Sequence, residues 1–329
     1  MPNPERIFTT LFAYQQTAAL KAAIELGVFT AIAGGASTTA EIAAKCGASE
    51  RGTRILCDTL VTHEFLTKDG DKYANSPESS FFLSTNSPAY LGSIAEFLCT
   101  PELVSSTMAL AECVRKGGTT MPGQGTVDPD NPMWVRFAEA MAPMIMPSAQ
   151  AIAAQVPVTG DLKVLDIAAG HGIFGILIAQ KNPTAQIVAL DWSAVLEVAK
   201  KNAAKFGVAD RYSTLPGDAF SVDYGSGYDI ILVTNFLHHF SAAANEGFLR
   251  NVNAALKPGG TVMTVEFVPD ESRVTPAMPA RFAMTMLTGT KEGDAYTFKE
   301  LDSMFRNAGF AHSTQQILPT GQSVIISTK

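Results

Sequence analysis

The sequence predicts an α/β protein whose C-terminal part is a Rossmann-like, doubly wound and mostly parallel sheet. Short apolar, largely β-branched runs alternate with helical segments, which is the pattern of a parallel sheet covered on both faces. These runs are Lys163 to Ile167, Gln186 to Leu190, Asp229 to Thr234 and Thr261 to Val265. A last pair, Ser313 to Leu318 and Ser323 to Thr328, predicts a C-terminal antiparallel hairpin at the sheet edge.

The first hundred residues predict an all-α, winged-helix-like domain. Apolar residues at helical spacing run from Phe8 to Ile32. Thr38 and Glu41 form a capping box for a second helix, and Ser49 can cap a third. The turn Asp69-Gly70-Asp71 then indicates a small hairpin or wing. We expect one domain over residues 1–100 and a second over 101–329, with a helical lead-in at 101–156.

Composition excludes some classes of partner. The 329 residues are 47% apolar and 17% charged, as in compact globular proteins. A net charge of -7 disfavours nucleic acid and anionic membranes as partners. In the helix that would read DNA, Arg51 and Arg54 are offset by acidic neighbours. The N-terminus lacks the apolar core of a signal peptide, so a cytoplasmic protein is expected. The four cysteines form no C-x-x-C pair and predict free thiols.

A glycine-rich turn follows the first strand of the predicted sheet. Asp166 leads into Gly170-His171-Gly172, where missing side chains let a ligand approach the backbone. About twenty residues on, Asp191 ends the second strand, where a carboxylate can accept hydrogen bonds from ribose hydroxyls. The alternative for Asp191 is a helix cap before Ser193. The turn alone does not separate NAD from S-adenosylmethionine (SAM).

Several further segments decide between these cofactors. They are Gly217-Asp218-Ala219-Phe220, Asn235-Phe236-Leu237-His238-His239-Phe240 and Lys257-Pro258-Gly259-Gly260. With the glycine turn they resemble the class I SAM-dependent methyltransferases. More narrowly, the chain is similar over nearly its whole length to plant caffeate-type and bacterial polyketide O-methyltransferases with an N-terminal dimerisation domain. The N-terminal segments "ELGVFTAIAGG", "RGTRILCDTLVTHEFL" and "SPAYLG" contribute to this resemblance.

The resemblance implies a SAM site, a homodimer and a role in secondary metabolism. Gly170 and Gly172 would cradle the amino-acid part of SAM, and Asn235 would lie beside its methionyl end. Asp191 would bind the ribose, and Asp218 with Ala219 or Phe220 the adenine. Asp166 and Trp192 are further cofactor-binding residues implied. Two departures are Ala168-Ala169, in place of a common glycine pair, and Thr234, where plant members often carry lysine.

Methyl transfer to a phenol requires a base, and His238 is the candidate. It directly follows the apolar run at 229–234, at the sheet end where cofactor and acceptor should meet. The resemblance places the family's catalytic histidine here, while its neighbour His239 remains an alternative. Glu266 and Glu292 are the candidate carboxylates that orient the base. The alternative for Glu292 is an ordinary solvated charge.

The predicted acceptor is a small, apolar and aromatic molecule. The residues expected to line its site are Phe137, Met141, Met144, Phe282 and Met286. The histidines do not combine with carboxylates at metal-ligand spacing, so a metal-free base mechanism is expected. The alternatives are N- or C-methylation of a small molecule, an NAD-dependent oxidoreductase, and a SAM-sensing winged-helix regulator.

Overall fold

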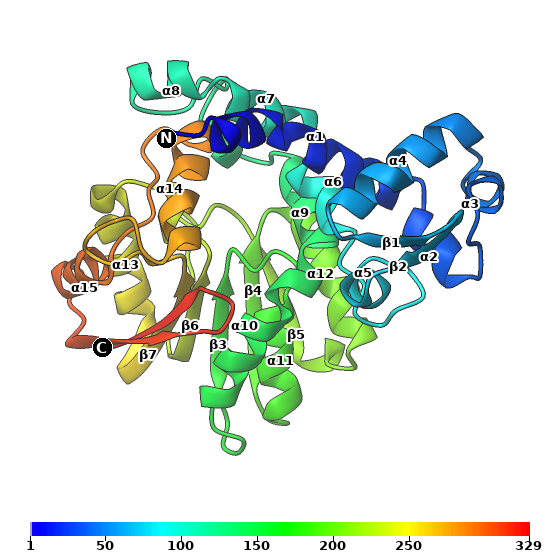
Figure 1. The fold of residues 1–329 in the computed structure, drawn as a ribbon. Coiled ribbons are helices and arrows are strands. Elements are labelled where there is room, and N and C mark those ends of the chain that lie inside the picture. The colour runs from blue at the N-terminus through cyan, green and yellow to red at the C-terminus, as the bar shows by residue number, and fades with distance from the viewer. Residues whose placement is uncertain (1) are drawn as a thin grey trace. The chain divides into compact units, whose positions relative to one another are not determined.

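The computed structural model describes residues 2–329, which fall into two compact units divided between Thr100 and Pro101. The N-terminal unit holds six helices and a two-stranded hairpin (Figure 1). Its elements are α1 (Glu5–Glu25), α2 (Val28–Ala33), α3 (Thr39–Cys46), α4 (Glu50–Thr62), β1 (Leu66–Asp69), β2 (Lys72–Asn75), α5 (Pro77–Phe82) and α6 (Ile94–Leu98). Helix, turn, helix and wing therefore follow in the predicted order.

Local signals explain most of this unit. The capping box of Thr38 and Glu41 is present at α3, and the Ser49 side chain accepts the amide N–H of Gly52 at the start of α4. The single helix predicted over 8–32 is wrong, because Gly27 adopts a left-handed conformation with φ of 71° and separates α1 from α2. The helical spacing of apolar residues continues through Gly27, so the sequence pattern did not indicate the break.

The C-terminal unit contains a seven-stranded sheet of order β5-β4-β3-β6-β7-β9-β8 (Figure 1). All pairs are parallel except β7 with β9 and β9 with β8. The strands are β3 (Lys163–Ile167), β4 (Gln186–Asp191), β5 (Tyr212–Pro216), β6 (Tyr228–Thr234), β7 (Leu256–Glu266), β8 (His312–Ile317) and β9 (Ser323–Thr328). The predicted doubly wound sheet with its antiparallel hairpin is confirmed.

Helices cover both faces of this sheet. Alternation within one strand shows why: Val164 of β3 packs with one core cluster, and Leu165 packs with the other. The helices of the unit are α7 (Pro101–Met108), α8 (Leu110–Lys116), α9 (Met133–Ala140), α10 (Ala142–Gln155), α11 (Ile173–Lys181), α12 (Ser193–Lys205), α13 (Ala242–Ala255), α14 (Ala277–Gly289) and α15 (Phe298–Asn307). Residues of α10, α11 and α12 pack on one face, and residues of α13 and α15 pack on the other.

Among residues 2–329, no helix is both long and apolar enough to span a bilayer.

Candidate functional site

The glycine turn predicted from the sequence lies between β3 and α11. Gly170 and Gly172 have φ of 56° and 76°, in the left-handed region that glycine adopts without steric cost. A Cβ at Gly172 would lie 2.5 Å from the hydroxyl of Tyr212. Ala168 also takes a left-handed φ of 53°, which costs a residue with a Cβ some free energy. The turn is thus a close-approach site with stored backbone strain.

Two carboxylates hold this turn, the half-buried Asp191 and the buried Asp166. Asp191, at the end of β4, accepts the amide N–H of Gly170 at 2.8 Å and that of Trp192 at 2.7 Å. Burial raises the pKa of Asp191 to about 6. Asp166 accepts the amide N–H of Gly175 at 3.1 Å, and burial, together with the charge of Asp191, raises its pKa to about 8. Asp166 is fully buried and therefore supports the turn from behind.

The loop after β5 lies beside Asp191. The amide N–H of Gly217 donates to the Asp191 carbonyl at 3.1 Å, and Asp218 accepts the amide N–H of Phe220 at 2.9 Å. The Phe220 ring packs in an aromatic cluster with Phe236, Phe240 and Phe248, and Ala219 is buried in the same core. Trp192 packs against the small cluster formed by Ala138, Val195 and Val198. The residues predicted for the ribose and adenine are thus neighbours.

A histidine and a glutamate meet at the carboxyl end of the sheet. Glu266 ends β7, and His238 lies in a short 3-10 turn after β6, with its Nδ1 2.5 Å from Glu266 Oε2. The other carboxylate oxygen, Oε1, accepts the amide N–H groups of Phe236 at 3.1 Å and Leu237 at 2.9 Å. Both side chains are buried. Because the carboxylate already accepts two backbone donors, Nδ1 of His238 is the donor and Nε2 is left with its lone pair.

The neighbouring His239 has a different environment. Burial, with the charge of His238, holds its pKa well below the usual range. Its Nδ1 is buried and has no hydrogen-bond partner among the described residues. Its ring lies 5.3 Å from the ring of Trp134, nearly perpendicular to it. His239 is therefore a neutral, packed side chain.

A chain of ring contacts joins the glycine turn to His238, and we call it the aromatic wall. Its rings are those of Phe137, Trp134, His239, His238 and Phe282. Successive centroids lie 5.5, 5.3, 4.2 and 4.8 Å apart. At its first end, Phe137 lies 3.8 Å from the position of a Cβ on Gly170. Trp134 was not among the residues predicted to line the site.

The other residues predicted for the site differ in their solvent exposure. Met141 and Met286 are buried, whereas Met144 is 37% exposed. Glu292 is exposed, and no hydrogen bond or ion pair of its side chain is found within the described residues. Its neighbour Asp294 donates a backbone N–H to the His238 carbonyl at 2.9 Å. The segment carrying Glu292 thus contacts the site through its backbone, while the Glu292 side chain points to solvent.

Asn235 directly follows β6 and has a left-handed φ of 53°. Its side-chain Oδ1 accepts a hydrogen bond from Gln322 Nε2 at 2.7 Å. Because β3 and β6 pair with Ile167 opposite Val233, the residue after β6 lies next to the start of the glycine turn. The sequence predicted Asn235 as a cofactor-binding residue, but it did not predict the contact with Gln322.

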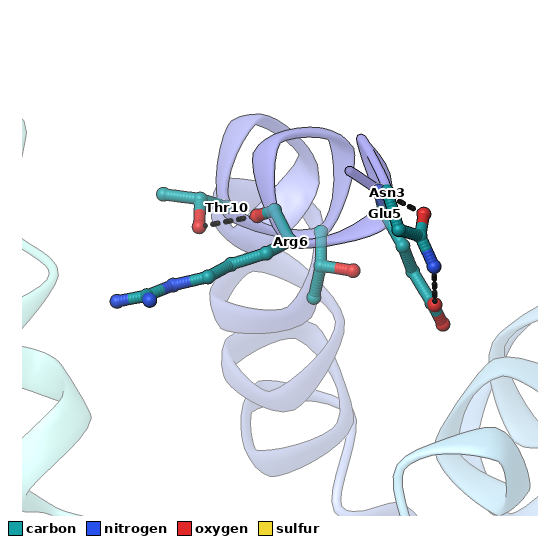
Figure 2. Close-up of a pocket in the computed structure, with 5 residues that line it drawn as sticks. Asn3, Glu5, Arg6 and Thr10 are labelled. Carbon is teal, nitrogen blue, oxygen red and sulfur yellow. Dashed lines mark hydrogen bonds between the residues drawn. The ribbon is translucent and has the colours of Figure 1, made fainter. Parts of the chain in front are cut away.

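Figure 2 shows a shallow polar pocket on the first turns of α1, lined by Asn3, Glu5, Arg6, Thr9 and Thr10. Its side chains largely satisfy one another, since Asn3 donates to Glu5 and Thr10 donates to the Arg6 carbonyl. The pocket belongs to the N-terminal unit and contains none of the residues above. Within residues 2–329, no group of three or more potential metal ligands lies together.

The fold and the site are typical of enzymes that bind a nucleotide-containing cofactor. The features that indicate this are the doubly wound sheet, the glycine turn with a carboxylate after the second strand, and the buried pair of His238 and Glu266 at the same sheet edge. The sequence pattern of the O-methyltransferase domain matches residues 118–311, and that of the O-methyltransferase dimerisation domain matches residues 8–85. The chain belongs to the SAM-dependent O-methyltransferase family.

Individual relatives agree with this assignment. The 3-hydroxy-5-methyl-1-naphthoate 3-O-methyltransferase of Streptomyces sahachiroi is 28% identical over 89% of this chain and 86% of its own. A Nostoc punctiforme protein described as an O-methyltransferase has a crystal structure that covers 100% of both chains, with 48% identity and a TM-score of 0.96. Human N-acetylserotonin methyltransferase in complex with SAM shares the fold, with a TM-score of 0.86, 22% identity, and coverage of 100% of this chain and 98% of that one.

The close approach at Gly172 yields a stability prediction. Gly172→Ala should lower the free energy of unfolding by about 1–3 kcal/mol, because the new Cβ meets Tyr212 and the left-handed φ is strained. As a control, Gly247→Ala in α13 meets nothing within 4 Å and should stabilise by up to about 1 kcal/mol. Urea denaturation followed by circular dichroism measures both. Equal stabilities for the two variants would contradict the packing described at the turn.

Proposed function

We propose that this protein transfers the methyl group of SAM to a hydroxyl oxygen of a small aromatic molecule, with His238 as the general base and without a catalytic metal. The observation that carries the proposal is the buried pair of His238 and Glu266, which leaves Nε2 of the imidazole free to accept a proton. The pair lies at the sheet edge where this fold binds its ligands.

The residues at the glycine turn suit the cofactor. Gly170 and Gly172 offer backbone that a ligand can approach closely, and they would hold the amino-acid part. Asp191 would accept the ribose hydroxyls, with Trp192 beside it, and the loop of Asp218, Ala219 and Phe220 would border the adenine. Asp166 would act indirectly, by holding the turn. When bound, SAM supplies an electrophilic methyl group on a sulfonium centre.

His238 would remove the acceptor's proton as the methyl group is transferred. A phenol has a pKa near ~10 and an unperturbed imidazole one near ~6.5, so phenol deprotonation at neutral pH needs a positioned base. Glu266 would hold the ring through Nδ1 and stabilise the imidazolium that forms. The backbone N–H groups of Phe236 and Leu237 fix the carboxylate in turn. The backbone N–H groups would thus hold Glu266 in place, and Glu266 would hold the imidazole of His238 so that Nε2 faces the acceptor oxygen.

The environment of His239 supports His238 as the base. A histidine whose pKa is held far below neutrality is a poor proton acceptor, and His239 is packed against Trp134. It lacks any carboxylate partner among the described residues. For Glu292, the exposed side chain supports at most a secondary role in catalysis.

The lining supports an aromatic acceptor. The aromatic wall offers ring faces and edges, and the buried Met141 and Met286 add polarizable, adaptable surface. The Streptomyces sahachiroi relative is named for a hydroxylated naphthoate, which is such an acceptor.

The test of acceptor class is a screen with methyl-labelled SAM against phenols, naphthols and flavonoid-like compounds, with products identified by mass spectrometry. Phenolic compounds should yield O-methyl products. Labelling confined to amines or to ring carbons would assign N- or C-methylation instead, and would end the proposal of O-methylation.

In that assay, His238→Ala should lower turnover by about 10²–10⁴-fold, because general-base catalysis is lost. The dissociation constant for S-adenosylhomocysteine (SAH), the demethylated product, should change little. His239→Ala serves as the matched control and should retain most of the activity. If His239→Ala is the inactive variant and His238→Ala is active, the base has been assigned to the wrong ring.

The raised pKa of Asp191 predicts how cofactor binding depends on pH. Above about 6 the carboxylate is ionised and accepts hydroxyl hydrogen bonds; below that value it is protonated, and affinity should fall by up to about tenfold per pH unit. Between pH 5 and 7 the two titratable neighbours at the turn keep their protonation states, because Asp166 has a pKa of about 8 and His171 one of about 4. Calorimetry with SAH should show this loss toward pH 5. Asp191→Asn should bind more weakly and remove the dependence, and an unchanged pH profile in that variant would refute the assignment.

We also propose that the protein is a homodimer that associates through its dimerisation domain. Helix α1 carries an apolar face exposed in the single chain: Ile7, Phe8, Leu11 and Phe12 are each 55–65% exposed. Exposed apolar patches on a soluble protein usually mark an interaction surface, and the matched family segment begins at residue 8.

Sedimentation velocity tests the dimer. The wild-type protein should sediment as a dimer, and the double variant Phe8→Asp/Phe12→Asp as a monomer, because two buried charges would oppose association. A matched control, Thr9→Asp/Thr10→Asp on the same turns of the helix, separates the effect of added charge from the loss of apolar contact. A monomeric wild-type protein at micromolar concentration would contradict the proposal.

A further inference from the structure

A buried polar relay connects three elements to the proposed cofactor site. Ser148 of α10 donates from Oγ to Gln322 Oε1 at 2.7 Å, and Gln322 donates from Nε2 to Asn235 Oδ1 at 2.7 Å. Ser148 is 0% exposed and Gln322 4% exposed. A buried amide needs partners for both its oxygen and its nitrogen, and here each has one. In this arrangement both ends of the Gln322 amide are held, with the Nε2 donor directed at Asn235.

The sheet topology explains why Gln322 reaches this site. It precedes β9, which is antiparallel to β7, with Ser323 opposite Glu266. The turn of the C-terminal hairpin therefore lies at the carboxyl end of the parallel strands, where the glycine turn and the pair of His238 and Glu266 also lie. A residue distant in sequence from Asn235 is thereby brought into contact with it.

The hydrogen bond from Gln322 also sets the orientation of the Asn235 side-chain amide. Because Oδ1 accepts from Gln322, the Asn235 amide turns its Nδ2 donors away from the relay. Nδ2 has no hydrogen-bond partner in the part of the chain that the structure describes, and Asn235 is only half-buried. We propose that Gln322 is a positioning residue that presents the Nδ2 donors of Asn235 to the α-carboxylate of SAM. The carboxylate only accepts hydrogen bonds, so the opposite orientation of the amide would repel it.

This inference rests on the proposed cofactor site, and two ligands separate the two claims. SAH carries the α-carboxylate, whereas 5′-methylthioadenosine keeps the nucleoside and sulfur and lacks the amino-acid part. Calorimetry on the full chain gives both dissociation constants. A wild-type protein that binds SAH no more tightly than 5′-methylthioadenosine would refute the amino-acid site itself, whatever the variants do.

The decisive variant is Gln322→Glu, whose carboxylate cannot donate to Asn235 and so forces the amide to reverse. SAH affinity should fall by about tenfold or more, because a hydrogen bond to a charged group is lost. Affinity for 5′-methylthioadenosine should stay within about twofold. Gln322→Met, which removes the hydrogen bonds without adding charge, should weaken SAH binding less. Gln316→Glu places the same change at an exposed site on β8 and should leave both affinities unaltered.

Equal losses for both ligands in Gln322→Glu would assign Gln322 a merely structural role and overturn the inference. Unchanged or tighter binding of SAH would overturn it as well, since the amide would then not face the carboxylate. If Gln322→Glu does not fold, Gln322→Met and Ser148→Ala decide the question. Both release the relay without a buried charge, and both should lower the affinity for SAH alone.

Discussion

The site depends on one hydrogen bond, between Nδ1 of His238 and the carboxylate of Glu266. Glu266 is 2% exposed and His238 4% exposed, so neither tolerates the loss of its partner. Phe236 and Leu237 donate backbone N–H groups to the second oxygen of this carboxylate, so both of its oxygens have hydrogen-bond partners. The 3-10 turn that supplies these donors also carries the histidine. The 3-10 turn and the Glu266 carboxylate therefore hold each other in place, and together they set the direction of the His238 ring.

Strain and burial are concentrated around the same sheet edge. Ala168 and Asn235 both take left-handed conformations, and the carboxylates of the buried Asp166 and the half-buried Asp191 have raised pKa values. Such features cost free energy and persist only where the surrounding structure enforces them. The two large cores on either side of the sheet provide that support. Stability from the cores thus holds the turns, the carboxylates and the aromatic wall in a fixed geometry.

Periodicity and spacing sufficed for the sheet, the glycine turn and the winged N-terminal unit, because those signals are local. The edge strand β5, Tyr212–Pro216, escaped prediction because it is short, mixed in polarity and ends in proline. The contact of Trp134 with His239 and the relay through Gln322 could not be predicted either. Gln322 lies 87 residues from Asn235, and no sequence spacing records that contact. Local patterns predicted the candidate base His238 and its partner Glu266, whereas contacts such as that of Gln322 with Asn235 depend on the tertiary structure.

The central claim is that the imidazole of His238 faces the acceptor while the glycine turn holds the methyl donor. A crystal structure with SAH and a phenolic acceptor tests it most directly. The account predicts the amino-acid part of SAH against Gly170 and Gly172, and the acceptor oxygen within hydrogen-bonding distance of His238 Nε2. Density for SAH elsewhere, or an acceptor oxygen held by another side chain with His238 turned away, would contradict it.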